Sequence, residues 1–125
     1  MSRSNVSVLV VEDEKLQSWS VARNLSSWGF DVRPVLTGHD ALAELEKAAY
    51  DVVLLDYQLP DVDGLEVARR ARQIQPQAAI ILITAFQENE LPAHAGLIDR
   101  YFNKPLDMQV LRQAILGAAR ASTAV

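Results

Sequence analysis

The fold is decided by the stretch Val52-Val53-Leu54-Leu55-Asp56-Tyr57-Gln58-Leu59-Pro60-Asp61. Its first four residues are branched and apolar, which is typical of a strand buried on both faces of a parallel sheet. A charge does not fit in the middle of such a strand, so Asp56 is expected where the strand reaches the surface. Open α/β folds bind their ligands at the carboxyl ends of their strands. Asp56 is therefore the first candidate for a functional residue.

Length and composition describe one ordinary globular domain. The chain has 125 residues, half of them hydrophobic and 22% charged, so it can bury a core and is not a disordered segment. It has no cysteine, which excludes disulfides and a thiol nucleophile and suits a reducing compartment. A net charge of −4 without a basic run argues against direct nucleic-acid binding.

The amino-terminal sequence indicates neither export nor membrane insertion. A short polar opening is followed by an apolar run that stops at Glu12, which is too short for a signal peptide or a membrane span. We therefore expect a cytoplasmic protein. The domain is expected at residues 1–120, with residues 121–125 as a tail or a truncated linker.

Strand patterns and helix patterns alternate along the chain. Continuous apolar runs at residues 6–11, 52–55 and 79–83 predict three central strands. Residues 31–35 alternate polar with apolar and include Pro34, which lacks a ladder N–H and belongs at an edge. A mixed strand is predicted at residues 98–103. The expected helix boundaries are a cap at Gly29, a capping box at Thr37 and Asp40, a start after Asp63-Gly64, and a last helix from about Asp107.

This alternation predicts a right-handed, doubly wound α/β sandwich of three layers around a five-stranded parallel sheet, a flavodoxin-like fold. The strand order 2-1-3-4-5 places the Pro34 strand at an edge and makes the first and third strands neighbours. Their carboxyl ends then meet where the strand order reverses. We expect Glu12, Asp13 and Asp56 to converge there from strands about 5 Å apart.

Three converging carboxylates repel one another and need a cation between them. Oxygen ligands with room for water favour a hard divalent ion such as Mg²⁺ over zinc or a soft metal. Lys104 and Thr84 leave the fifth and fourth strands at the same end of the sheet and add a positive charge and a hydroxyl. This set suits a transferred phosphoryl group, with the Asp56 carboxylate as the nucleophile that becomes an acyl phosphate.

The ordered set of motifs resembles the receiver domain of two-component response regulators, from residue 6 to about residue 120. The motifs are Val10-Val11-Glu12-Asp13-Glu14, Asp56-Tyr57-Gln58-Leu59-Pro60-Asp61-Val62-Asp63-Gly64, Ile83-Thr84-Ala85 and Lys104-Pro105-Leu106. The resemblance implies that Asp56 accepts phosphate from a phosphohistidine on a sensor histidine kinase or a phosphotransfer protein. It also implies no enzymatic activity beyond the protein's own phosphorylation and dephosphorylation.

The resemblance implies roles for the other site residues. Glu12, Asp13, Asp56 and the backbone carbonyl of Gln58 would hold Mg²⁺. Thr84 and Lys104 would bind the phosphoryl oxygens. Phosphorylation adds roughly 1.5 to 2 negative charges, which can draw Thr84 inward and leave space for the aromatic switch residue Tyr101 to turn in. The output would be a changed interaction surface made by the fourth helix, fifth strand and fifth helix of the family fold.

The chain departs from the family pattern between Thr84 and Lys104. This interval is a couple of residues shorter than usual and contains Pro92. The family's fourth helix is therefore expected to be short, displaced or frayed, which weakens the expectation of a dimer through this face. Gln58 and Phe86 occupy positions where such domains tune attack by water, and the bulky Phe86 could shield an acyl phosphate.

Trp19 is a candidate docking residue for the phosphodonor. It lies nearly opposite the apolar stripe of the first helix, which flanks the acidic site and commonly meets the donor in this family. Other residues have structural interpretations: a turn and cap for Asp61 and Asp63, a solvated face for Arg69, Arg70 and Arg72, and surface positions for His39 and His94. Glu12 and Asp13 alone would also suit a helix start.

Three alternative functions have specific requirements. A phosphatase of the haloacid-dehalogenase type needs a second acid two residues after its nucleophile, where Gln58 stands. A flavodoxin-like binding domain needs a phosphate-cradling loop after the first strand, where Glu12-Asp13-Glu14 would repel phosphate. The third is a receiver-like module that signals without phosphorylation. Because nothing essential is missing from the acidic site, the phosphoacceptor interpretation is favoured.

Overall fold

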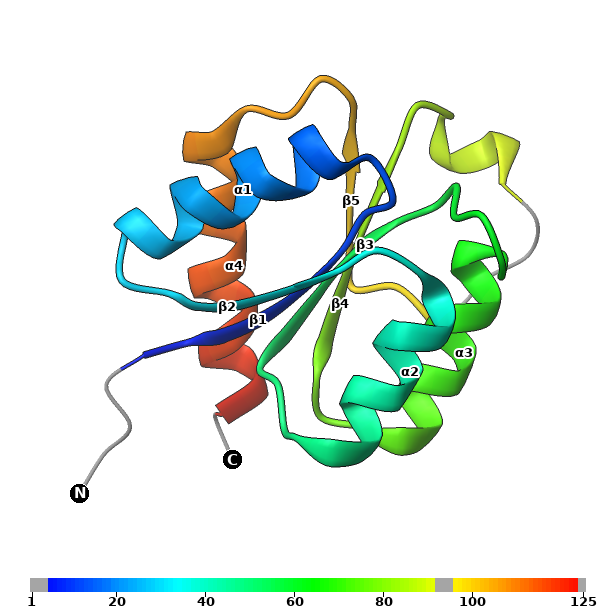
Figure 1. Ribbon diagram of the computed structural model, residues 1–125, viewed down its shortest axis with the longest axis horizontal. Helices are drawn as coiled ribbons and strands as arrows, with labels where there is room; N and C mark the ends of the chain where they lie inside the picture. Colours follow the sequence, from blue (N-terminus) through cyan, green and yellow to red (C-terminus); the bar gives the residue numbers. More distant parts are fainter. Residues whose placement is uncertain (1–4, 92–95, 124–125) are drawn as a thin grey trace.

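The computed structural model describes residues 5–91 and 96–123 (Figure 1). Along the chain the elements are β1 (Ser7–Val11), α1 (Lys15–Ser27), β2 (Asp31–Val35), α2 (Gly38–Lys47), β3 (Val52–Asp56), α3 (Gly64–Ile74), β4 (Ala79–Thr84), the short 3₁₀ helix η1 (Glu88–Glu90), β5 (Arg100–Asn103) and α4 (Met108–Thr123). Within these ranges, no helix combines the length and apolarity that a membrane crossing requires.

The sheet has five parallel strands in the order β2-β1-β3-β4-β5, which confirms the predicted topology. α1 and α4 cover one face, and α2 and α3 cover the other (Figure 1). β1 pairs with β3 in a register that joins Val11 to Leu55. Glu12 and Asp56, the next residue on each strand path, therefore leave the sheet side by side.

The central strands are buried because both faces of the sheet are covered. Every residue of β1, β3 and β4 is buried, whereas β2 is mostly exposed. β2 pairs only with β1, and its Pro34 lies opposite Val10, so the predicted edge position of this strand is confirmed. Alternate side chains enter two cores: Leu9, Val53 and Leu55 pack toward α2 and α3, and Val8, Val10 and Leu54 pack toward α1 and α4.

Most predicted helix boundaries are confirmed by their caps. Gly29 ends the first helical segment with a φ of 92°, a conformation that favours glycine. The Thr37 hydroxyl accepts a hydrogen bond from the Asp40 amide, and the Asp107 carboxylate accepts hydrogen bonds from the first turn of α4. Asp63 caps α3 by accepting from the Leu65 amide. α4 continues to Thr123, three residues past Arg120. The domain boundary expected at residue 120 stays a prediction.

Asp61 caps a different helix from the one expected. Its carboxylate accepts hydrogen bonds from the amides of Gly38 and His39, both at 2.9 Å, so it caps α2 and not α3. His39 is exposed, as predicted, and its Nδ1 lies 3.1 Å from an Asp61 oxygen. Burial raises the pKa of Asp61, but these amide hydrogen bonds outweigh it and hold the pKa below its usual range. The loop that follows Asp56 is thereby attached to α2.

The segment between β4 and β5 contains only the three-residue η1 among its described residues. Pro92 and His94 lie outside the described residues. β5 begins at Arg100, two residues later than predicted. The Asp99 carboxylate accepts a hydrogen bond from the Ile80 amide at 2.7 Å. At this point a side chain from the chain before β5, and not a main-chain carbonyl, accepts the hydrogen bond of a β4 amide.

Arg72 is not part of a solvated face, and that prediction was wrong for this residue. Its guanidinium donates hydrogen bonds to the carbonyls of Ala78 and Leu97 and to the Asp99 carboxylate. Arg69 and Arg70 are exposed, as predicted. The difference arises because Arg72 lies in the last turn of α3, within reach of the chain entering β4 and β5.

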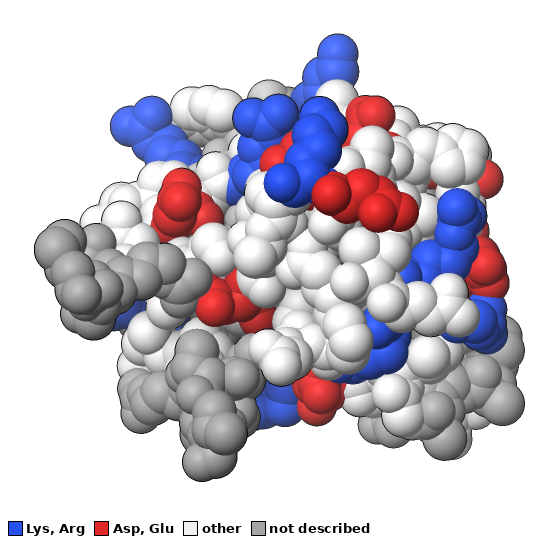
Figure 2. Space-filling model, turned by 90° about the horizontal axis from the view of Figure 1, so that it is seen from below, with Lys and Arg blue, Asp and Glu red and all other residues white. Residues whose placement is uncertain are grey.

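Basic and acidic side chains are interspersed at the other end of the molecule from the site. Figure 2 shows this surface from below, the side on which β3 and β4 begin. The described Lys and Arg side chains visible there do not merge into a continuous basic surface of the kind that phosphate backbones require. The expectation that this domain does not bind nucleic acid directly stays a prediction.

Replacing Arg72 with alanine is expected to lower the free energy of unfolding by about 2–3 kcal/mol, because Arg72→Ala leaves the Asp99 carboxylate and two carbonyls without their charged donor. Denaturant unfolding measures this loss. Arg70→Ala, an exposed position on the same helix, is the matched control and should change stability by less than about 0.5 kcal/mol. Equal losses in both variants would contradict the structural role of Arg72.

Candidate functional site

Three carboxylates converge at the carboxyl end of the sheet, as the strand order predicts. Glu12 and Asp13 follow β1, and Asp56 is the last residue of β3. One oxygen of each lies within 4.8 Å of the others. Glu12 and Asp56 are buried, with Asp56 only 4% exposed, whereas Asp13 is exposed and opens the cluster to solvent. A group of oxygen ligands with one open side suits a hard divalent cation.

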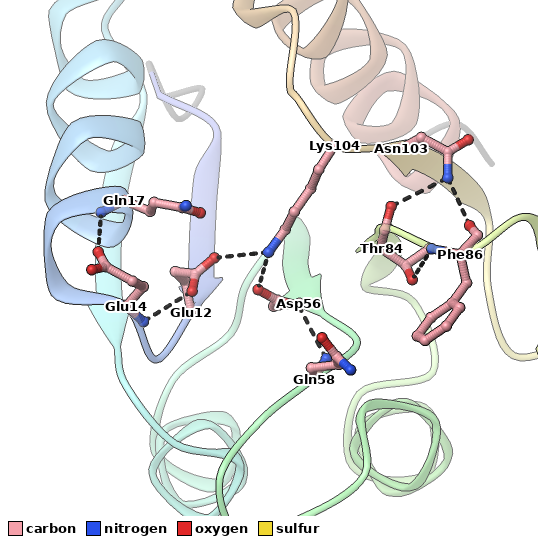
Figure 3. Close-up of polar contacts among 9 residues, drawn as sticks. All are labelled: Glu12, Glu14, Gln17, Asp56, Gln58, Thr84, Phe86, Asn103 and Lys104. Carbon is pink, nitrogen blue, oxygen red and sulfur yellow. Dashed lines mark hydrogen bonds and ion pairs between the residues drawn. The ribbon is translucent and has the colours of Figure 1, made fainter.

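Lys104 joins this cluster from the end of β5 (Figure 3). Its Nζ lies 2.8 Å from one Asp56 oxygen and 3.9 Å from a Glu12 oxygen. The second Asp56 oxygen accepts a hydrogen bond from the Gln58 amide at 3.0 Å. Both Asp56 oxygens therefore have a donor, which fixes the orientation of a buried carboxylate. The Lys104–Pro105 peptide bond is cis.

The pKa of Glu12 is raised to about 7, mainly by burial and further by its hydrogen bond with Asp56 and by the Asp56 charge. The Glu14 amide, which donates to Glu12 at 2.9 Å, and the Lys104 charge act in the opposite direction. Burial lowers the pKa of Lys104, but its hydrogen bond and ion pair with Asp56 outweigh burial, so that pKa lies above its usual value. One ammonium thus faces three carboxylates, and the set carries excess negative charge. Such a set can accept an added cation.

Thr84 is buried at the end of β4, the strand next to β3. Its Oγ1 accepts a hydrogen bond from the Phe86 amide at 3.0 Å. The Phe86 ring packs edge to face against Tyr57, with ring centroids 5.9 Å apart. Asn103, the residue before Lys104, donates hydrogen bonds to the carbonyls of Thr84 and Phe86. The sequence analysis did not single out Asn103 or Tyr57. Asn103 directly precedes Lys104, and Tyr57 directly follows Asp56.

Tyr101 lies on β5, opposite Leu82 of β4. It is half-buried and packs against the core that α2 and α3 cover. The side chain is thus neither fully inward nor fully exposed.

Trp19 projects from α1 and is 60% exposed, as expected from its position on the helix. The Arg23 guanidinium lies 5.2 Å from the centre of the Trp19 ring, in a cation–π contact. Leu16, one turn before it, is 75% exposed. Two large apolar side chains on one exposed helix face form a surface that a protein partner can cover.

A cleft of about 510 Å³ separates α1 from the connection between β5 and α4. Glu12, Asp56 and Lys104 line its polar end. The remainder is mainly apolar, with Val10, Val21, Leu54, Ile83, Leu106 and Met108 among the lining residues. The sequence did not indicate this cleft, because these positions all fit the pattern of core residues.

Comparisons with known proteins agree with this architecture. The family model described as the response regulator receiver domain matches residues 8–116. The transcriptional regulatory protein ZraR of Salmonella typhimurium is 31% identical over 118 residues, which cover 92% of this chain and 26% of ZraR. The chain thus spans about a quarter of that relative's length.

Solved structures of similar fold include a CheY-like receiver domain protein from Methanospirillum hungatei, with a TM-score of 0.89, 26% identity and coverage of 95% of this chain and 97% of that one. The response regulator TrrA from Thermotoga maritima, in complex with Mg²⁺-BeF, has a TM-score of 0.83 and 28% identity, with coverage of 90% and 98%. The family match spans most of the chain, the strand order is the predicted one, and the acidic cluster is in place. The chain belongs to the family of response regulator receiver domains.

Proposed function

We propose that this receiver domain takes a phosphoryl group onto Asp56 from a phosphohistidine on a sensor histidine kinase or a phosphotransfer protein. The observation that carries the proposal is the buried Asp56 carboxylate, held by Lys104 at 2.8 Å within an acidic cluster. An Asp56 oxygen forms the new bond to phosphorus while the phosphorus–nitrogen bond of the donor breaks, and the electron pair of that bond stays on the imidazole nitrogen.

The metal ion that fits this cluster is Mg²⁺, because all the available ligands are oxygens. Glu12, Asp13 and Asp56 would hold it together with the backbone carbonyl of Gln58. When bound, Mg²⁺ neutralises charge on the phosphoryl oxygens. The Mg²⁺-BeF complex of the similar protein TrrA supports this assignment.

The remaining site residues orient and stabilise the phosphoryl group. The Lys104 ammonium, raised in pKa by its pairing with Asp56, stays charged and binds a phosphoryl oxygen. The Thr84 hydroxyl already accepts from the Phe86 amide, so its own proton is available to donate to another phosphoryl oxygen. Movement of Thr84 toward the phosphoryl group would open space for the half-buried Tyr101 to turn inward. The domain would act on its own aspartate only and signal through the changed surface.

The partner that supplies phosphate is proposed to dock on α1. Trp19 and Leu16 are exposed on this helix, and the apolar cleft beside it leads to Asp56. A donor that covers Trp19 would thus be adjacent to the phosphoacceptor. The signal would then pass from the changed surface to an output domain or a downstream protein.

The first test concerns the cation site and its pH dependence. In the presence of a chelator, ionisation of Glu12 is expected to destabilise the fold as the pH rises from about 4.5 to about 7, because the folded protein holds the Glu12 proton more tightly than the unfolded chain does. Glu12→Gln removes this contribution, on the order of 1–3 kcal/mol. Denaturant unfolding of both proteins across this pH window measures the difference.

Addition of Mg²⁺ above this window should stabilise the natural protein, because the cation favours the ionised cluster. Glu12→Gln should show a smaller Mg²⁺ effect. Parallel pH profiles for the two proteins in chelator would contradict the ionisation of Glu12 as the cause, and equal stabilisation by Mg²⁺ would contradict its role as a ligand.

A second test identifies the phosphoacceptor. Incubation with acetyl phosphate and Mg²⁺ should increase the intact mass by one phosphoryl group, and Asp56→Asn should abolish the increase because an amide is not a comparable nucleophile. Asp40→Asn, an exposed aspartate in the first turn of α2, is the control and should be phosphorylated normally. A phosphorylated Asp56→Asn variant, or an unmodified natural protein, would refute the assignment.

A third test separates partner docking from chemistry. Trp19→Ala should reduce kcat/KM for phosphotransfer from the cognate phosphohistidine donor by about fivefold or more, as for an exposed aromatic at an interface centre. The rate with acetyl phosphate should not change, since that donor is too small to cover α1. Gln73→Ala, an exposed position on α3, serves as the control. The docking role is excluded if Trp19→Ala leaves transfer from the cognate donor unaltered.

A further inference from the structure

Asn103 is the last residue of β5 and directly precedes Lys104. Its Nδ2 donates hydrogen bonds to the Thr84 carbonyl at 3.2 Å and to the Phe86 carbonyl at 2.7 Å (Figure 3). The sheet does not need these bonds, because the Lys104 amide already donates to the Thr84 carbonyl at 3.1 Å. Asn103 is exposed, so burial does not require an amide side chain there either. Its carboxamide therefore acts on the chain beyond the end of β4.

Phe86 is held at three points, although it follows the end of its strand. Its carbonyl accepts from Asn103, its amide donates to the Thr84 hydroxyl, and its ring packs against Tyr57. Tyr57 is the residue after Asp56. The hydrogen bonds of Asn103 thus fix the main chain of two residues. Thr84 carries the hydroxyl that is proposed to bind the phosphoryl group, and Phe86 carries the ring that packs on Tyr57.

We infer that Asn103 is a positioning residue that prolongs the lifetime of the acyl phosphate on Asp56 by holding Thr84 and Phe86 in place. This inference rests on the proposed phosphorylation of Asp56. Hydrolysis requires a water oxygen to bond to phosphorus while the bond from phosphorus to the Asp56 oxygen breaks. The carboxylate then reforms, and inorganic phosphate leaves with the oxygen of the water. A Phe86 ring held against Tyr57 limits the approach of water. A Thr84 main chain held at its carbonyl keeps the Thr84 hydroxyl within reach of the phosphoryl oxygens.

The variant Asn103→Ala removes both donors and leaves Lys104 and the carboxylates unchanged. We expect its acyl phosphate to be lost about threefold to tenfold faster than that of the natural protein, the factor that one or two neutral hydrogen bonds supply. Asn103→Asp keeps the shape but replaces the donors with oxygens that face two carbonyls, so it should hydrolyse at least as fast. Mg²⁺ affinity should be unchanged in Asn103→Ala.

Phe86→Ala tests whether Asn103 acts through the ring. If it does, the double variant will lose phosphate more slowly than the product of the two single effects predicts, because the second change removes an interaction already lost. Asn24→Ala is the matched control, since the Asn24 carboxamide donates within α1, to the Ser20 carbonyl. Its acyl phosphate should have the natural lifetime.

The decisive experiment loads each protein with acetyl phosphate and Mg²⁺, removes the donor and follows the intact mass over time. A natural protein that gains no phosphoryl group contradicts the proposed function, whereas gain with an unchanged or longer lifetime in Asn103→Ala contradicts this inference alone. Amide hydrogen exchange of the unphosphorylated proteins provides a second measurement. Exchange at Phe86 should be faster in Asn103→Ala, and unchanged exchange would overturn the inference even without phosphorylation.

Discussion

The parallel pairing of β1 with β3 is the constraint on which the site depends. Its register places Val11 beside Leu55, so the residues that follow, Glu12 and Asp56, must leave the sheet together. Two acids would not gather in a buried position without a strong opposing force, and the apolar burial of both strands supplies it. The fold thus holds together charges that would separate in a flexible chain.

The repulsion between the three clustered carboxylates determines what the site can bind. Lys104 compensates only part of the charge of three carboxylates, and burial, followed by the hydrogen bond and charge of Asp56, raises the pKa of Glu12. A bound cation or a phosphoryl group that engages Lys104 changes this balance directly. A change of charge at Asp56 can therefore shift the conformational equilibrium of the residues around it, which is what a switch requires.

The chain between β4 and β5 is organised by side chains at both of its ends. Arg72 and Asp99 hold the segment that enters β5, and Asn103 holds the residues that leave β4. Among the described residues only η1 is helical in this interval. These hydrogen bonds therefore hold the segment against the sheet, as helix packing does elsewhere in the molecule. The hydrogen bonds of Asn103 lie next to the site, whereas those of Arg72 lie near the opposite end of the sheet. One end of this segment therefore positions residues next to the site, and the other end stabilises the fold.

Local patterns in the sequence were enough to predict the strand order, the edge position of Pro34, the cap at Gly29 and the meeting of Glu12, Asp13 and Asp56. Each of these follows from hydrophobic periodicity or from the conformational limits of one residue type. The roles of Arg72, Asp61 and Asn103 were decided only by the tertiary structure. Most of their partners lie 17 to 27 residues away in the chain. A polar side chain on a helix or loop carries no periodic signal of which distant carbonyl or amide will lie beside it.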